Sequence, residues 1–104
     1  MNVTVPSKKD HGVARAAAVT FVGDGTAAII KLGFNPLCLD MINTTDVVSY
    51  KKLSVMNATD CFKSVAVGTN TVDTTSQILF NGDGTVTIAA ATNIAGKVFS
   101  LFVH

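Results

Sequence analysis

Short stretches of alternating apolar and polar residues recur along the chain. Leu37, Leu39 and Met41 would share one face of an extended segment, and Thr85-Val86-Thr87-Ile88 alternates in the same way. Alternation with a period of two is typical of a strand that buries one face. The pattern predicts eight short strands, over residues 16–22, 26–32, 37–42, 47–56, 61–67, 78–80, 85–88 and 97–103.

Sequences that favour tight turns separate these stretches. Asn43–Asp46 and Asn57–Asp60 are polar turns of similar make, and residues 68–75 are predicted to be a polar loop. The frame F-x-G-D-G-T occurs at Phe21–Thr26 and again at Phe80–Thr85, which predicts two hairpins with the same turn chemistry. Short strands at such spacing predict an all-β chain, folded as a single-domain antiparallel β-sandwich or small barrel.

The first residues differ from the rest of the chain. Residues 1–12 combine Pro6, Lys8, Lys9 and a glycine, which makes a poor core segment. We therefore expect an extended N-terminal arm over 1–12, followed by one β-sandwich domain over 13–104. Val3 and Val5 could form a short edge strand within the arm, ended by Pro6.

The last predicted strand is apolar on both faces. Phe99, Leu101 and Val103 lie on one face, and Val98 and Phe102 lie on the other. A strand in a sheet with one solvated face would carry polar groups on that side. The sequence therefore predicts either a central strand in a covered sheet or a strand whose outer face meets another subunit.

Composition supports a β fold and narrows the function classes. The 104 residues are 48% hydrophobic, contain no Glu, and carry a net charge of +1. Fourteen Val and thirteen Thr favour strands over helices. The charge balance argues against nucleic-acid binding, and the short apolar runs argue against a membrane span. Cys38 and Cys61 are expected to be reduced thiols, with a disulfide between them as the less favoured alternative.

The inventory of catalytic and metal-binding groups is small. The two histidines are His11, near the N-terminus, and His104, the last residue. No Cys/His spacing suits zinc, and four of the seven aspartates fall in turn sequences, where turn formation is the simpler explanation. Lys51, Lys52 and Lys63 could form a basic patch, although a solvated face is the default interpretation. We expect no catalytic, metal or cofactor-binding residues and no enzymatic activity.

Two segments resemble a known group of proteins. The first is F-V-G-D-G-T-A-A-I-I-K-L-G-F-N-P, residues 21–36, followed by an apolar strand and Asn43-Thr44-Thr45-Asp46. The second is T-V-T-I-A-A-A-T-N-I-A-G-K-V-F-S-L-F-V, residues 85–103. From about residue 19 onward the chain resembles small virion structural proteins of tailed bacteriophages, in a G-F-x-P turn, an N-x-T-D-type turn and a closing N-x-x-G followed by an aromatic strand. It lacks the Trp that those proteins often carry in their middle and last strands.

The resemblance implies a β-sandwich that decorates and stabilises a capsid as a cement protein. The implied partners are the major capsid protein and further copies of the chain, in a homotrimer, and the implied location is the capsid surface of a virion assembled in the host cytoplasm. The expected capsid-contact residues of the arm are Val3, Val5, Lys8 and Lys9. The expected subunit-interface residues are Phe99, Leu101 and Val103.

Other functions stay open on the sequence. The chief alternative is a tail-fibre or host-recognition module that binds carbohydrate, with contacts in loops 43–46, 57–60 and 68–75. A small hydrolase would need His11 or His104 to lie beside an aspartate. A β-sandwich adaptor of bacterial origin is a further alternative.

Overall fold

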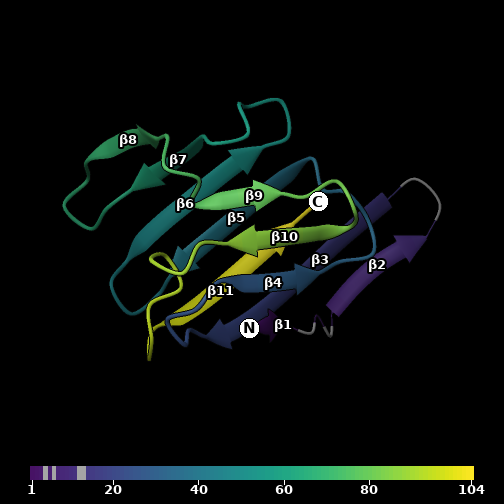
Figure 1. The fold of residues 1–104 in the computed structure, drawn as a ribbon, viewed down its shortest axis with the longest axis horizontal. Coiled ribbons are helices and arrows are strands. Elements are labelled where there is room, and N and C mark those ends of the chain that lie inside the picture. The colour runs from purple at the N-terminus through teal and green to yellow at the C-terminus, as the bar shows by residue number, and fades with distance from the viewer. Residues whose placement is uncertain (4, 6, 12–13) are drawn as a thin grey trace.

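The protein is built from strands joined by turns (Figure 1). The computed structural model describes residues 1–3, 5, 7–11 and 14–104, with side chains for 1–3, 5 and 16–104. In chain order the strands are β1 (Asn2–Val3), β2 (Ser7–His11), β3 (Ala14–Val22), β4 (Ala28–Lys31), β5 (Cys38–Asn43), β6 (Val48–Leu53), β7 (Cys61–Ser64), β8 (Asn70–Asp73), β9 (Ile78–Phe80), β10 (Thr85–Ile88) and β11 (Val98–Val103).

The strands form two sheets that face each other. The smaller sheet has the order β1-β4-β10-β9, and the larger has the order β2-β3-β11-β5-β6-β7-β8. All neighbouring strands are antiparallel except β1 and β4, which pair in parallel. The prediction of an all-β, antiparallel fold is confirmed, and the architecture is a sandwich rather than a closed barrel.

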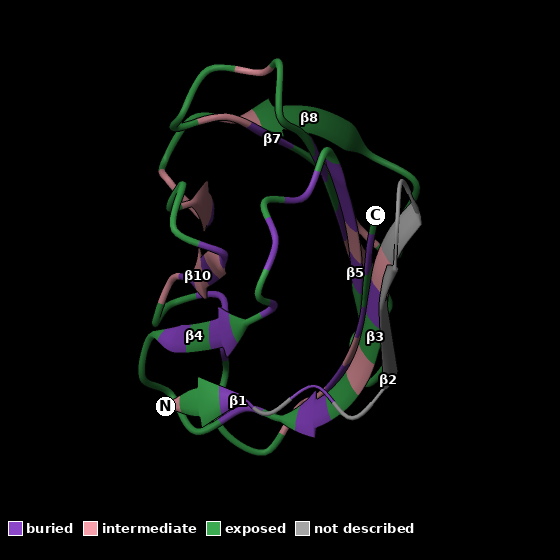
Figure 2. Ribbon diagram, turned by 90° about the vertical axis from the view of Figure 1, so that its right-hand side faces the viewer, coloured by how far each residue is buried: buried purple, intermediate pink, exposed green. Residues whose placement is uncertain are grey.

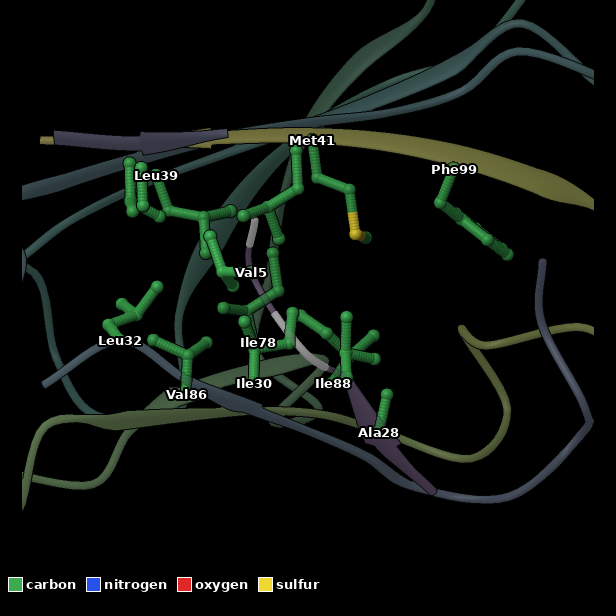
Figure 3. Close-up of a cluster of buried hydrophobic side chains, with 14 of the residues drawn as sticks. Val5, Ala28, Ile30, Leu32, Leu39, Met41, Ile78, Val86, Ile88 and Phe99 are labelled. Carbon is green, nitrogen blue, oxygen red and sulfur yellow. The ribbon is translucent and has the colours of Figure 1, made fainter. Parts of the chain in front are cut away.

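The core fills the space between the two sheets (Figure 2). Leu39, Met41 and Phe99 extend from the larger sheet towards Ile30 and Ile88 of the smaller one (Figure 3). Phe99 stacks on Phe21 with ring centroids 5.4 Å apart. Every second residue along these strands points inward from both sheets, as a sandwich requires.

The N-terminal residues belong to the sandwich instead of forming a separate arm. Strand β1 pairs with β4, and the Met1 ammonium donates a hydrogen bond to the carbonyl of Ala27. Val3 and Val5 are buried in the core, and β2 pairs with β3 at the edge of the larger sheet. The described residues among 1–12 therefore do not form the separate extended arm that the sequence predicted, because they pair with β4 and β3.

The eight predicted strands are all present, with shifts of a few residues at their ends. Strands β2 and β8 were not predicted, and β1 was predicted only in part, as a possible edge strand at Val3 and Val5. Strand β8 occupies 70–73, inside the predicted polar loop, and its side chains are mostly exposed. It pairs with β7 through the backbone, so no hydrophobic alternation marks it in the sequence.

The two G-D-G-T turns share local chemistry but not topology. Asp83 lies between β9 and β10, which form an antiparallel hairpin as predicted. Asp24 lies between β3 and β4, which belong to different sheets, so the prediction of a hairpin there is wrong. In both turns the Asp accepts hydrogen bonds from the backbone N–H and the hydroxyl of the Thr two residues later.

Candidate functional site

The outer face of the larger sheet exposes an ordered row of side chains. Phe102 of β11 is paired with Asp40 of β5, Asp40 with Lys51 of β6, and Lys51 with Phe62 of β7. The register extends the row to Ala18 on one side and to Val72 on the other. Beyond Ala18 the register continues to Ser7 of β2. The members whose side chains are described are Ala18, Phe102, Asp40, Lys51, Phe62 and Val72.

A second row runs beside the first along the strands. Ser100 is paired with Thr20 and with Ile42, and Ser49 is paired with Ile42 and with Ser64. The hydroxyls of Thr20 and Ser100 are hydrogen-bonded at 3.2 Å. This row is therefore mostly hydroxyl-bearing, with Ile42 as its exposed apolar member.

Together the two rows form a shallow groove of about 730 Å³ over β3, β11, β5, β6 and β7. Phe102 and Phe62 are 44% and 41% exposed, although residues of this size are usually buried. Contiguous exposed apolar groups rimmed by polar ones mark interaction surfaces. The groove is the candidate functional site.

One ion pair lies at the centre of the groove. The Lys51 ammonium is 3.9 Å from an Asp40 carboxylate oxygen, and each side chain is about half exposed, at 54% and 49%. An exposed pair of this kind adds at most about 1 kcal/mol to folding stability. Its charges are therefore available to a partner without a large cost to the fold.

The expected capsid-contact residues divide into two groups. Val3 and Val5 are core residues, so they are not contact points on a free arm. Lys8 and Lys9 lie in β2, at the edge of the larger sheet, in register with Ala17 and Ala16 of β3. The side chains of these two lysines lie outside the described residues.

The expected subunit-interface residues also lie in the core. Phe99 and Val103 are fully buried and Leu101 is 3% exposed, because these three face the smaller sheet. Strand β11 lies between β3 and β5, as expected for a central strand. The prediction of an interface at Phe99, Leu101 and Val103 is corrected: Ser100 and Phe102 are the members of this strand that face the groove.

The three lysines considered as a basic patch do not share one face. Lys51 points into the groove, whereas Lys52 is 2% exposed. The Lys52 ammonium donates hydrogen bonds to the carbonyls of Asn57, Ala58 and Asp60, at 3.2, 3.2 and 2.6 Å. Burial lowers the pKa of Lys52, although the nearby Cys61 and Asp60 act in the opposite direction. Lys52 therefore organises loop 57–60.

Replacing Lys52 with Met should destabilise the protein by about 2–4 kcal/mol, because three loop carbonyls lose a charged donor. The matched control is Lys51→Met, which removes the same ammonium from the exposed face. Urea unfolding of both variants checks the prediction. Equal stability of the two would contradict the structural role of Lys52.

Three aspartates cap their own turns. Asp24, Asp73 and Asp83 each accept hydrogen bonds from the hydroxyl and the backbone N–H of the Thr two residues later. The Thr side-chain hydrogen bond is the main cause that lowers the pKa of each carboxyl below its ordinary 3.8. The expected role of Asp24 and Asp83 in turn formation is confirmed.

These lowered pKa values predict a specific acid dependence. The folded-state carboxyls hold protons less tightly than the unfolded ones, so their stabilisation is complete above the unfolded pKa, near 3.8. It is lost as the pH falls below about 4 towards the folded pKa values. Thr26→Val and Thr85→Val should lower the melting temperature at pH 7 and should differ less from the native protein at pH 2.

Thermal unfolding at the two pH values measures this difference. Thr71→Val is the control, because Thr71 is an exposed residue of strand β8. It should change the melting temperature by the same amount at both pH values. A penalty for Thr85→Val that is equal at pH 7 and pH 2 would count against the capping interaction.

The residues with catalytic potential are dispersed. His104 is exposed, and its ring centroid lies 5.2 Å from that of Phe102, while the His11 side chain lies outside the described residues. Cys38 and Cys61 are buried and free, and burial is the main cause that raises both thiol pKa values. In the described part of the chain, no group of three or more His, Cys, Asp or Glu residues could hold a metal ion.

Comparison with known proteins gives no relative. No protein-family model, curated protein or solved structure matches the chain. Within the described ranges, no helix is long and apolar enough to cross a membrane. The resemblance to virion proteins therefore rests on the turn and strand motifs themselves.

The sequence analysis did not find the groove. Alternation showed that Asp40 and Ile42 share a face, and that Val98 and Phe102 share another. The missing information was the strand order, because β11 lies next to β5 although the two are far apart in the chain. The exposure of Phe62 and Phe102 appears only in the structure, and only the register places the two in one row.

Proposed function

We propose that this chain is a non-enzymatic structural protein of a bacteriophage particle, which decorates and stabilises the capsid. The supporting observation is the open groove on the larger sheet, with exposed Phe62 and Phe102. Small-molecule sites usually enclose most of their ligand, whereas this face is broad and open. Such a face is better suited to another protein surface.

The edge of the larger sheet offers a second surface for protein contact. Strand β2 has one described neighbour, β3, so its other side is an edge. An edge strand can pair with a strand of another protein through backbone hydrogen bonds. We propose that β2, including Lys8 and Lys9, contacts the major capsid protein.

The motifs behind the resemblance have structural roles in this fold. In the G-F-x-P turn, Phe34 is buried and the Asn35 side chain accepts a hydrogen bond from the N–H of Gly84 at 2.9 Å. Asn43 binds the backbone of its own turn, and Asn93 is fully buried. These turns are the motifs in which the chain resembles small virion proteins, and their structural roles support a similar fold. The proposed capsid role extends this resemblance from fold to function.

Particles that lack this protein would test the proposal. Purified recombinant chain should bind them saturably in co-sedimentation and should raise the temperature at which they release their genome. Lys8→Ala/Lys9→Ala should weaken binding, whereas Lys31→Ala, in β4 of the smaller sheet, should not. Failure of the native chain to bind such particles would contradict the proposed function.

Glycan recognition is the second candidate function. One observation favours it: Phe62 and Phe102 line the same groove as Asp40 and Ser49, which combines aromatic faces with hydrogen-bonding groups. NMR titration with a panel of oligosaccharides should shift groove resonances if this function holds. Shifts confined to loops 43–46 or 57–60 would point to the loop sites expected from the sequence instead.

A further inference from the structure

The part of the row with described side chains, from Ala18 to Val72, has the same order of chemistry from either end, and Ser7 of β2 follows Ala18 in the register. It reads apolar, aromatic, charged, charged, aromatic, apolar, from Ala18 through Phe102, Asp40, Lys51 and Phe62 to Val72. The two central charges have opposite sign. A surface that is complementary to itself in this way suits a symmetric pair of identical chains, in which each contact occurs twice.

We infer that two copies of the chain form a two-fold dimer by packing the outer faces of their larger sheets together. The two-fold axis lies between β5 and β6 and runs along the strands. It brings Asp40 opposite Lys51 of the partner subunit, and Lys51 opposite Asp40 of the partner subunit. The same rotation brings Phe102 opposite Phe62 of the partner subunit.

The charges select this arrangement over its alternatives. Asp40 and Lys51 are already neighbours at 3.9 Å within one chain. In the dimer they form an alternating square, so that each carboxylate lies near two ammonium groups. A sliding or differently rotated arrangement would bring like charges together or leave charges facing apolar groups, which costs free energy.

The rest of the face fits a second copy. The second row places Ser100 opposite Ser64 of the partner subunit and Ile42 opposite Ser49 of the partner subunit. Packed sheets lie about 10 Å apart with strands nearly aligned. This spacing leaves room for Phe102 of each chain to pack against Phe62 of the partner subunit. Six strands at ~4.8 Å and two rows of residues ~6.8 Å apart give a footprint of about 400 Å². This is about half of the roughly 800 Å² per partner of a standard interface.

The inference goes beyond the proposed function and does not depend on it. A dimer of this kind forms in solution without a capsid, so it is tested on the purified chain alone. It also differs from the homotrimer implied by the resemblance, because a face-to-face two-fold contact closes with two copies.

Charge reversal provides the test, with mass measured by sedimentation equilibrium on the full chain. The native chain should have the mass of two chains. Asp40→Lys alone and Lys51→Asp alone should each weaken dimerisation about tenfold or more, because like charges then face each other across the axis. An equimolar mixture of the two single variants should form a heterodimer, and the double variant Asp40→Lys/Lys51→Asp should form a homodimer again.

The controls separate folding from association. Both reversals are on the exposed surface, so the circular dichroism of the single variants should match that of the native chain. Val67→Asp, which changes an exposed apolar residue outside the groove, should leave the dimer unchanged. A native chain that is monomeric or trimeric, single reversals that dimerise normally, or a mixture that stays monomeric would overturn the inference.

Discussion

Replacing Gly23 with Ala should prevent the protein from folding stably at 25 °C. Gly23 is buried where the chain leaves β3, and its N–H donates a hydrogen bond to the carbonyl of Lys97 at 2.9 Å. A Cβ at this position would lie 2.2 Å from the carbonyl oxygen of Ile94 and 2.9 Å from the Phe99 ring. Neither the backbone oxygen nor the fully buried ring can move away without breaking the core.

The expected loss exceeds about 4 kcal/mol, a large part of the 5–15 kcal/mol of a typical domain. Gly82→Ala is the matched control, because nothing lies within 4 Å of its added Cβ and the cost comes only from its φ of +80°. That variant should lose about 1 kcal/mol. Soluble yield and urea unfolding give the comparison, and similar stability of the two variants would contradict the packing around Gly23.

Replacing Leu101 with Asp should also unfold the protein. Leu101 is 3% exposed and lies between Val19 and Met41 in the register of the larger sheet. The substitution removes an apolar side chain from the core, at about 2–5 kcal/mol, and buries a carboxylate without a partner, at several kcal/mol more. The sum reaches the whole stability of a typical domain.

Phe102→Asp is the control for Leu101→Asp on the same strand. Phe102 is 44% exposed and faces the groove, so this variant should stay folded and should lose the dimer instead. Circular dichroism and urea unfolding distinguish the two outcomes. A folded Leu101→Asp variant with near-native stability would show that this face of β11 is not the core face.

The strands were largely predictable because their alternation reflects burial. Leu39 and Met41 are buried as their spacing predicts, and Thr85–Ile88 pairs as a strand of the smaller sheet. Strand β8 could not be predicted, because its residues are polar or exposed and only backbone pairing holds it. The G-D-G-T turns show the same limit: their local hydrogen bonds were predictable, whereas the sheet that each flanking strand joins depends on distant contacts.

The candidate site was harder to predict than the fold. Strand β11 carries a phenylalanine on each face, Phe99 on one and Phe102 on the other, so its pattern could not tell which face meets the core. The answer depends on the smaller sheet, which covers Phe99 and leaves Phe102 exposed. The arm was misjudged for a related reason, since Val3 and Val5 become core residues only because β1 joins β4.

The most direct test of the proposed function is the number of copies of this chain per purified phage particle. Quantitative mass spectrometry against the major capsid protein measures it. A capsid decoration protein should be present in hundreds of copies, in a fixed ratio to the capsid protein. A few to a few tens of copies would indicate a tail or fibre component, and absence from the particle would contradict the account.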